Sequence, residues 1–267
     1  AMGLGGAERH VIALASGLRK RGYDAGLVCL FEEGVLAGEV RRLEIPFACL
    51  NLPRRWGAGT MRGVFRWLRQ NPTDILHTYL FGFHFYAGLP ARMLRTPVIL
   101  SSRREIARWK KVRHGWAENL GNLFADGVVC CSQAAEQWTL ETEKIRPDKV
   151  FTIHNGVDTD RFAGAGGGRD EIRRDLGIPS EALVIGTVAN FSPDKGYPHL
   201  LEAARTVLKE IPSAYFLCVG SGPLLEEMQK TARAMPGGER LIFTGSREDV
   251  PVLLDAMDVF VLASVTE

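Results

Sequence analysis

A lysine stands in the loop 190–196, which reads Asn-Phe-Ser-Pro-Asp-Lys-Gly. The loop follows an apolar run that predicts a strand and precedes a pattern typical of a helix. Lys195 could therefore reach a diphosphate as a mobile point charge and stabilise negative charge on a leaving group. If the loop stood alone, a solvated lysine in a turn set by Pro193 and Gly196 would be the preferred interpretation.

Three further loops hold glycine or serine where a phosphate or a base could be bound. Gly5 and Gly6 open a helical pattern, and glycines there let backbone N–H groups approach an anion at a helix N-terminus. Gly220 and Gly222 form a glycine turn that lacks the full dinucleotide fingerprint. Ser246 lies in a loop that could present backbone groups to a base. A structural turn explains each of these loops equally well when it is taken alone.

Residues that would bind a metal or act as a nucleophile are not grouped in the sequence. Asp158 and Asp160 have an Asp-x-Asp form that can bind a metal, but they lie beside a glycine-rich stretch and are interpreted as turn and cap residues. No Gly-x-Ser-x-Gly elbow, P-loop motif or zinc-type His/Cys spacing is present. Hydrolase, P-loop and zinc chemistry are not supported, and no metal is expected.

Composition places the chain among globular proteins. It has 267 residues, 46% of them hydrophobic, which is enough for two domain-sized cores. No apolar run approaches the roughly 20 residues of a membrane span. The N-terminus lacks a signal-peptide pattern, and the five cysteines are interpreted as reduced thiols, so a cytoplasmic protein is expected.

The net charge of +2 hides an asymmetry. Residues 1–160 carry 22 Lys or Arg against 16 Asp or Glu, whereas residues 161–267 carry 11 against 15. A basic half could favour an anionic ligand or membrane surface, but ordinary solubility is the preferred interpretation, and no nucleic-acid partner is predicted.

The elements that position these loops are predicted to form an α/β protein. Short apolar runs alternate with helical periodicity, which is the form of repeated βαβ units around a parallel sheet. Strands are predicted at 25–30, 75–78, 98–101, 128–131, 150–154, 183–189, 215–219, 241–244 and 259–263. Helical patterns cover 11–18, 61–69, 106–123, 197–210, 223–234 and 250–256.

The glycine-rich stretch 163–168 divides this series. It predicts a first domain at 1–162, a linker and connecting segment at 163–180 and a partial second domain at 181–267. Each domain would be a doubly wound parallel sheet, with the two facing a cleft between the carboxyl ends of their strands. The loop at Gly5 should follow a strand and the last strand should be followed by more of its sheet, so truncation at both ends is expected.

Five motifs in one order extend over almost the whole chain. They are Gly5-Gly6-Ala7-Glu8, Asn155-Gly156-Val157-Asp158, Ser192-Pro193-Asp194-Lys195-Gly196, Gly220-Ser221-Gly222 and Ala263-Ser264-Val265-Thr266-Glu267. Together they make the chain resemble glycosyltransferase family 4. The resemblance implies a GT-B fold of two facing Rossmann-like lobes and sugar transfer from a UDP-sugar or GDP-sugar with retention of configuration.

The resemblance also implies residue roles, with Lys195 and Glu267 as the catalytic pair. Lys195 would contact the donor diphosphate, and Gly5 and Gly6 would lie near the phosphates and the acceptor. Glu267 matches the first glutamate of the family's Glu, seven residues, Glu motif, which holds the donor sugar. The second glutamate is not in this sequence, so the chain alone is expected to be inactive. Asn190 stands where the family commonly has Arg, so a charge-assisted phosphate contact would be weakened or lost.

On the acceptor side, many family members carry a His-x-His that faces the sugar. Here the run is His77-Thr78-Tyr79, and His77, Tyr79 or His84 could take that place. A core or loop histidine is the preferred interpretation of each.

Arg103 leads into the helical pattern 106–123, which could contact an acceptor or a membrane. Its apolar stripe is flanked by Lys and Arg and consists of Ile106, Trp109, Val112, Trp116, Leu120 and Leu123. A basic amphipathic helix with tryptophans can lie on the inner face of an anionic membrane, which would suit a lipid-linked acceptor. Packing of the stripe on the first sheet is favoured, because this regular spacing is typical of core helices.

The family interpretation needs no protein nucleophile and no metal. The expected reaction moves a hexose-type sugar to a glycan, lipid-linked or small-molecule acceptor, with the donor phosphate helping to take the proton. One alternative is a GT-B-fold sugar-nucleotide epimerase. Another is a degenerate, non-catalytic sugar-nucleotide-binding protein, which Asn190 favours and which Lys195 and Glu267 oppose.

Overall fold

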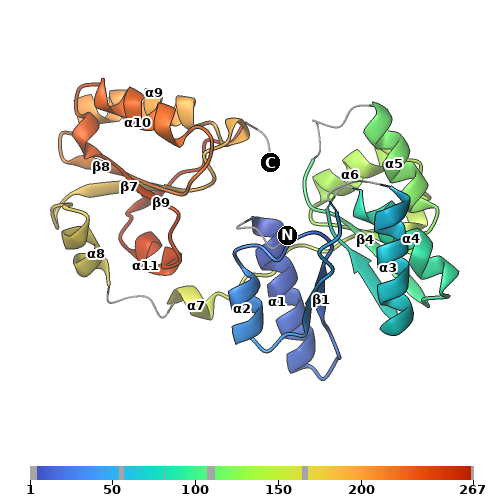
Figure 1. Ribbon diagram of the computed structural model, residues 1–267. Helices are drawn as coiled ribbons and strands as arrows, with labels where there is room; N and C mark the ends of the chain where they lie inside the picture. Colours follow the sequence, from blue (N-terminus) through green and yellow to red (C-terminus); the bar gives the residue numbers. More distant parts are fainter. Residues whose placement is uncertain (1–4, 54–56, 81, 107–111, 164–167, 266–267) are drawn as a thin grey trace. The chain divides into compact units, whose positions relative to one another are not determined.

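The computed structural model describes residues 5–53, 57–80, 82–106, 112–163 and 168–265. Contacts divide the chain into two compact units, Ala1–Gly156 and Val157–Glu267. The division precedes the predicted boundary at residue 162, and the helix α8 (Arg169–Asp175) lies where the sequence predicts a linker (Figure 1). Ile172 of α8 is buried in an apolar cluster of the second unit, so this stretch is part of that unit's core.

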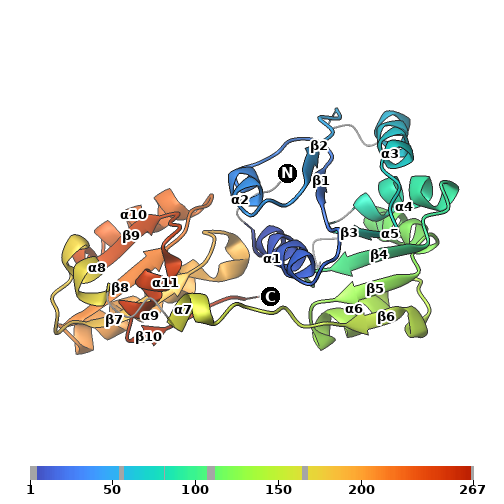
Figure 2. The same ribbon diagram turned by 90° about the horizontal axis from the view of Figure 1, so that it is seen from below.

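The described residues of the first unit form two parallel sheets (Figure 2). One pairs β1 (Leu27–Cys29) with β2 (Phe47–Cys49). The other has the order β3-β4-β5-β6 and consists of β3 (Ile75–Thr78), β4 (Val98–Arg103), β5 (Gly127–Cys130) and β6 (Val150–Thr152). Because these four strands are parallel, their carboxyl ends meet at one edge of the sheet.

Helices connect and cover these strands. They are α1 (Gly6–Lys20), α2 (Ala37–Arg42), α3 (Ala58–Gln70), α4 (Phe83–Met93), α5 (Val112–Asn122), α6 (Gln133–Thr142) and the short 3₁₀ helix η1 (Pro147–Lys149). Val64 of α3, Ala87 of α4 and Ile99 of β4 share one buried apolar cluster, while Ile12 of α1 and Val40 of α2 share another. These clusters fix the edge at which the polar loops emerge.

Helix α5 packs in the reverse of the orientation that its apolar stripe predicts. Glu118 and Asn122 are buried, and Gly121 lies so close to α4 that a Cβ there would be 2.9 Å from the Cβ of His84. Three apolar side chains are instead exposed by 72%, 42% and 72%: Trp116, Leu120 and Leu123. The prediction that this part of the stripe packs on the sheet is therefore wrong. Trp109 lies outside the described residues.

In its described part, the second unit is built on a parallel sheet of order β10-β7-β8-β9. Its strands are β7 (Leu183–Val188), β8 (Ala214–Val219), β9 (Leu241–Gly245) and β10 (Val259–Phe260). Besides α8, its helices are α7 (Asp160–Ala163), η2 (Pro193–Lys195), α9 (Tyr197–Glu210), α10 (Leu225–Arg233), η3 (Gly238–Arg240) and α11 (Val250–Asp255). One apolar cluster joins α9 and α10 to the sheet and a second joins α8 and α11 to it, as expected of a doubly wound unit.

A buried arginine ties α8 to this sheet. Arg173, which is 2% exposed, donates to the carboxylate of Asp258 and to three backbone carbonyl oxygens. Asp258 also accepts from the backbone N–H of Val184 and from Arg169. Although burial alone would raise it, these donors and cations hold the pKa of Asp258 at about 2.

Across the described ranges, no helix is long and apolar enough to cross a membrane. Those same ranges hold no group of three or more His, Cys, Asp or Glu side chains that could bind a metal ion. All five cysteines are free thiols.

Candidate functional site

The strand order of the second unit reverses at β7. The chain runs from β7 through β8 to β9 and then returns to the other side of β7 with β10. The carboxyl ends of β7 and β10 therefore form a switch point in strand order, where open α/β sheets bind ligands. Lys195 lies in the loop that follows β7 and Ser264 in the stretch that follows β10.

Loops from neighbouring strands are bonded to one another at this edge. The backbone N–H of Phe191 donates to the carbonyl oxygen of Ser221 at 3.0 Å, and that of Val265 donates to the carbonyl oxygen of Asp194 at 2.8 Å. The hydroxyl oxygens of Ser221 and Ser246 are 2.7 Å apart. These loops carry the predicted residues Asn190, Lys195, Gly220, Gly222 and Ser246.

The glycines of these loops are required by the protein backbone itself. Gly196, Gly220 and Gly222 have φ angles of +64°, +140° and +156°. A Cβ at Gly196 would be 1.9 Å from the carbonyl oxygen of Ala263, and one at Gly220 would be 2.0 Å from that of Ala189. Close packing of the loops after β7, β8 and β10 therefore accounts for these glycines without a bound phosphate.

Lys195 ends η2 and stands just before the N-terminus of α9. Its Nζ lies 3.8 Å from the carboxylate of Asp194, and its side chain is 23% exposed. Helix α9 has no side-chain cap at Gly196, and its N-terminus adds partial positive charge to this edge. The Oγ of Ser264 is buried without a hydrogen-bond partner. Glu267, the other predicted catalytic residue, lies outside the described residues.

The predicted glycine loop of the first unit leads into α1. Gly5 is the N-terminal cap residue, and a Cβ there would be 2.4 Å from the carboxylate of Glu8. A Cβ at Gly6 would meet nothing within 4 Å. A phosphate contact at Gly5 and Gly6 stays a prediction.

Polar side chains also gather at the carboxyl edge of the first unit's sheet. His77 of β3 places its Nε2 2.8 Å from the Oγ of Ser102 in β4. The phenol oxygen of Tyr79 lies 3.2 Å from the Nδ1 of His77. The ring of His10, one turn into α1, is 6.3 Å from the ring of Tyr79. Two of the predicted residues, His77 and Tyr79, thus lie together with two that were not predicted.

Arg104, directly after β4, is the charged member of this group. Its Nη2 donates to the side chain of Asn155, which follows β6. Burial, then the charge of Arg104 and the neighbouring His10, lower the pKa of His77 to about 4. Burial and Arg104 also lower the pKa of His10, and burial raises the pKa of Tyr79. These three rings are therefore neutral at pH 7.

His84 and Arg103, also predicted for the acceptor side, lie in the interior and are 4% and 5% exposed. Arg103 Nη2 is 2.7 Å from Glu143 and 3.1 Å from Glu118, while its Nη1 is 3.0 Å from His84 Nε2. Since arginine can only donate, His84 Nε2 accepts, and its Nδ1–H donates to the Thr78 hydroxyl 2.8 Å away. As placed, both side chains belong to an internal network that an acceptor does not reach.

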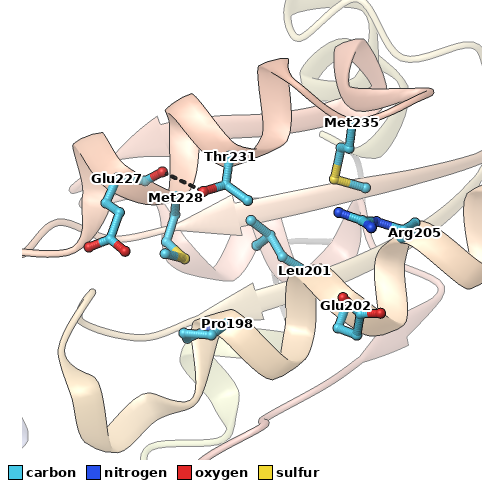
Figure 3. A pocket seen from close by; sticks show the side chains of 8 residues that line it. All are labelled: Pro198, Leu201, Glu202, Arg205, Glu227, Met228, Thr231 and Met235. Atoms are coloured by element: carbon cyan, nitrogen blue, oxygen red, sulfur yellow. Dashed lines mark hydrogen bonds between the residues drawn. The ribbon is translucent and has the colours of Figure 1, made fainter.

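A hollow of about 190 Å³ lies elsewhere in the second unit, between α9 and α10 (Figure 3). Its lining combines apolar and charged side chains: Pro198, Leu201, Glu202, Arg205, Glu227, Met228, Thr231 and Met235. None of the predicted site residues lines it, so the candidate site is the loop edge and not this hollow.

Two parallel α/β units with polar loops at their strand ends define a GT-B-type protein. Residues 4–161 match the family model described as Glycosyltransferase Family 4, and residues 168–267 match the one described as Glycosyl transferases group 1. The chain belongs to glycosyltransferase family 4, which confirms the resemblance carried by the five motifs.

Individual relatives agree with this class. The chain is 26% identical over 277 residues to UDP-Gal:alpha-D-GlcNAc-diphosphoundecaprenol alpha-1,3-galactosyltransferase of Escherichia coli, covering 99% of this chain and 71% of that protein. It is 29% identical over 235 residues to 2-deoxystreptamine glucosyltransferase of Streptomyces kanamyceticus, covering 82% and 60%. The fold resembles that of Anabaena Alr3699/HepE, solved in complex with UDP and glucose, with a TM-score of 0.84, 21% identity and coverage of 97% and 71%. Glycosyl transfer is accordingly the reaction class of this chain.

Proposed function

We propose that the protein transfers a hexose from a UDP-sugar to a lipid-linked or other glycan acceptor, with a GDP-sugar as the alternative donor. The observation that carries this proposal is the convergence of Lys195 and three neighbouring loops on the switch point of the second unit in a family 4 chain. The E. coli relative, aligned along 99% of this chain, is named for a UDP-Gal donor and a diphosphoundecaprenol acceptor. A small-molecule acceptor is the alternative, as in the name of the S. kanamyceticus relative.

In this reaction the acceptor hydroxyl attacks the anomeric carbon on the face from which the diphosphate leaves. The new C–O bond forms as the bond to the diphosphate oxygen breaks, the leaving phosphate takes the hydroxyl proton, and configuration is retained. Lys195 and the N-terminus of α9 stabilise the charge that gathers on the diphosphate. The reaction as proposed uses no metal and no protein nucleophile.

Titration calorimetry of the full-length natural protein with UDP, GDP and ADP tests the donor. We expect UDP or GDP to bind and ADP to bind far more weakly. Product analysis by NMR with UDP-hexoses and GDP-mannose, with and without EDTA, then reads the sugar, the anomeric configuration and the metal requirement. Absence of UDP and GDP binding contradicts the proposal. Binding without turnover would favour the non-catalytic alternative, and formation of an epimerised sugar nucleotide would favour the epimerase.

We further propose that the outward face of α5 rests on an anionic membrane, which suits a lipid-linked acceptor. Trp116 of α5 and Leu123, which directly follows the helix, are each 72% exposed. The backbone N–H of Lys144 donates to the side chain of Asn119 at 2.6 Å, which places an exposed cationic residue beside the helix. Residues 108–113 of the sequence contain four Lys or Arg and no acidic residue. Exposed aromatic and aliphatic side chains next to basic residues are what anionic lipid surfaces bind.

Co-sedimentation with vesicles tests this surface. We expect the protein to bind vesicles that contain phosphatidylglycerol, to bind phosphatidylcholine vesicles weakly, and to be released by salt. Replacing both Trp116 and Leu123 by serine should weaken binding by about 10-fold or more, because two large apolar side chains no longer enter the interface. Val35→Ser is the matched control, since Val35 is also 72% exposed in the first unit. Equal vesicle binding by both variants, or loss of a dimer in the double variant, contradicts the membrane proposal.

A further inference from the structure

Arg104 has an unusual set of neighbours for a partly buried cation. Its Nη2 donates to Asn155, but its Nε is buried and has no hydrogen-bond partner. No ion pair links Arg104 to a carboxylate anywhere in the described part of the chain. A buried donor that has lost its water without gaining a partner is unfavourable, and more so on a charged group.

Arg103, the preceding residue, shows how the first unit stabilises a buried arginine. Arg103 is held by the carboxylates of Glu143 and Glu118, by the amide of Asn122 and by the ring of His84. Arg104 has none of these partners, although it comes from the same strand end. Its charge is therefore not used by the fold in the way that the charge of Arg103 is.

The surroundings of Arg104 suit an anion. His10, His77 and Tyr79 are close enough to the Arg104 charge for it to act on their pKa values, and all three side chains are neutral at pH 7. The group lies at the carboxyl ends of β3 and β4, the edge at which parallel sheets bind ligands. It presents one uncompensated positive charge together with neutral hydrogen-bonding groups.

We propose that Arg104 binds a phosphate group of a substrate, with Nε and one Nη donating side by side to two phosphate oxygens. The planar guanidinium fork matches phosphate geometry, and a rotation of this partly exposed side chain would present the buried Nε, a donor that the fold leaves unused, to the ligand. This inference rests on the proposed function and adds to it a residue and a chemical group. Two substrates of that reaction carry phosphate, a lipid-diphosphate acceptor and the donor nucleotide.

Kinetics of Arg104→Gln and Arg104→Lys in the full-length protein separate these two sources. We expect Arg104→Gln to raise either the KM for a lipid-diphosphate acceptor or the Kd for UDP by about 10- to 100-fold, and Arg104→Lys to be intermediate. If the bound phosphate belongs to the acceptor, Arg104→Gln and the natural protein should have the same KM for the same glycan on an uncharged aglycone. The affinity for UDP should then be unchanged. If the bound phosphate belongs to the donor, UDP affinity falls with either acceptor. Arg69→Gln, on the exposed end of α3, is the matched control.

Thermal unfolding distinguishes this binding role from a structural one. Because a neutral glutamine side chain would no longer bury an unpaired charge, the melting temperature of Arg104→Gln should be unchanged or raised. Calorimetry with inorganic pyrophosphate in a Lys195→Ala background adds a readout that does not require transferase activity, and Arg104→Gln should abolish the remaining binding. If Arg104→Gln abolishes pyrophosphate binding but the full-length protein transfers no sugar, the proposed function is rejected while the phosphate site is supported. An unchanged acceptor KM together with an unchanged UDP affinity in Arg104→Gln, or a marked fall in its melting temperature, would overturn the phosphate-binding role of Arg104.

Discussion

Replacing Lys195 by alanine in the full-length natural protein is expected to weaken UDP binding about 10-fold or more and to lower kcat/KM by about 100- to 1000-fold. The lysine stands at the strand-order switch point beside the N-terminus of α9, where a leaving diphosphate would gather charge. Its contact with Asp194 is a 3.8 Å ion pair between partly exposed groups, and such pairs contribute only about 0–1 kcal/mol to stability. Calorimetry with UDP and initial-rate kinetics measure the two effects.

Two variants make this experiment specific. Lys209→Ala removes an exposed lysine from the last turn of α9 and should change neither affinity nor rate. Lys195→Arg keeps the charge and should retain part of the UDP affinity, with a lower rate if the position of the cation matters. An unchanged UDP affinity in Lys195→Ala would contradict the assignment of this loop to the donor diphosphate.

The buried parallel strands could be predicted because they read as short, continuous apolar runs. The run 128–131 overlaps β5, all four residues of which are buried, and the run 183–189 extends one residue beyond β7. Several described elements escaped prediction, among them β2, α2, α4 and α6, and two of these have clear physical reasons. Strand β2 has three partly buried residues, which is too short to show a pattern. Helix α4 is apolar on most sides and contains Pro90, so it has neither a clear stripe nor a helix-like composition.

The loops of the second unit could be predicted as a group, because residues that follow parallel strands are collected at one edge whatever the details of packing. The first unit was harder to predict. Arg103 and Arg104 are adjacent, and successive residues of a strand point to opposite sides, so only the register of β4 decides which of them is interior. His10 lies on a helix, where nothing in the sequence relates it to the strand ends. The five motifs, taken in order, identified the family because together they combine signals that are weak when each is taken alone.

Helix α5 shows a related limit of prediction from sequence. Its periodicity locates a stripe of apolar residues correctly, but periodicity does not say which face is buried. Glu118 and Asn122 turn inward because Arg103 needs acidic and amide partners in the interior, and Asn122 Oδ1 accepts from Arg103 at 2.9 Å. The buried charge network therefore determines the orientation of the helix and leaves Trp116 and Leu123 exposed.

Removal of the cation at the centre of that network should have the largest effect on stability. Although burial alone would lower the pKa of the Arg103 guanidinium, its hydrogen bond and charge interaction with Glu143 and the charge of Glu118 raise it, so Arg103 stays charged. Arg103→Met would leave two buried carboxylates without their cation, because Glu118 and Glu143 have side-chain exposures of 1% and 5%. We expect a loss of about 3–5 kcal/mol in the unfolding free energy of the first unit.

Denaturant unfolding of Arg103→Met measures this loss, and Arg92→Met is the matched control. Arg92 pairs with Asp126 at 2.7 Å, but its side chain is 41% exposed, so its removal should cost about 0–1 kcal/mol. Without Arg103, burial and mutual repulsion raise the pKa of Glu118 and Glu143 above their unfolded values. The penalty is then greatest at neutral pH and falls as the carboxylates are protonated, so the difference from the natural protein should narrow toward acidic pH. Adding Glu118→Gln and Glu143→Gln should recover part of the loss at pH 7, and a deficit independent of both pH and these substitutions would show that Arg103 acts through packing and not through its charge.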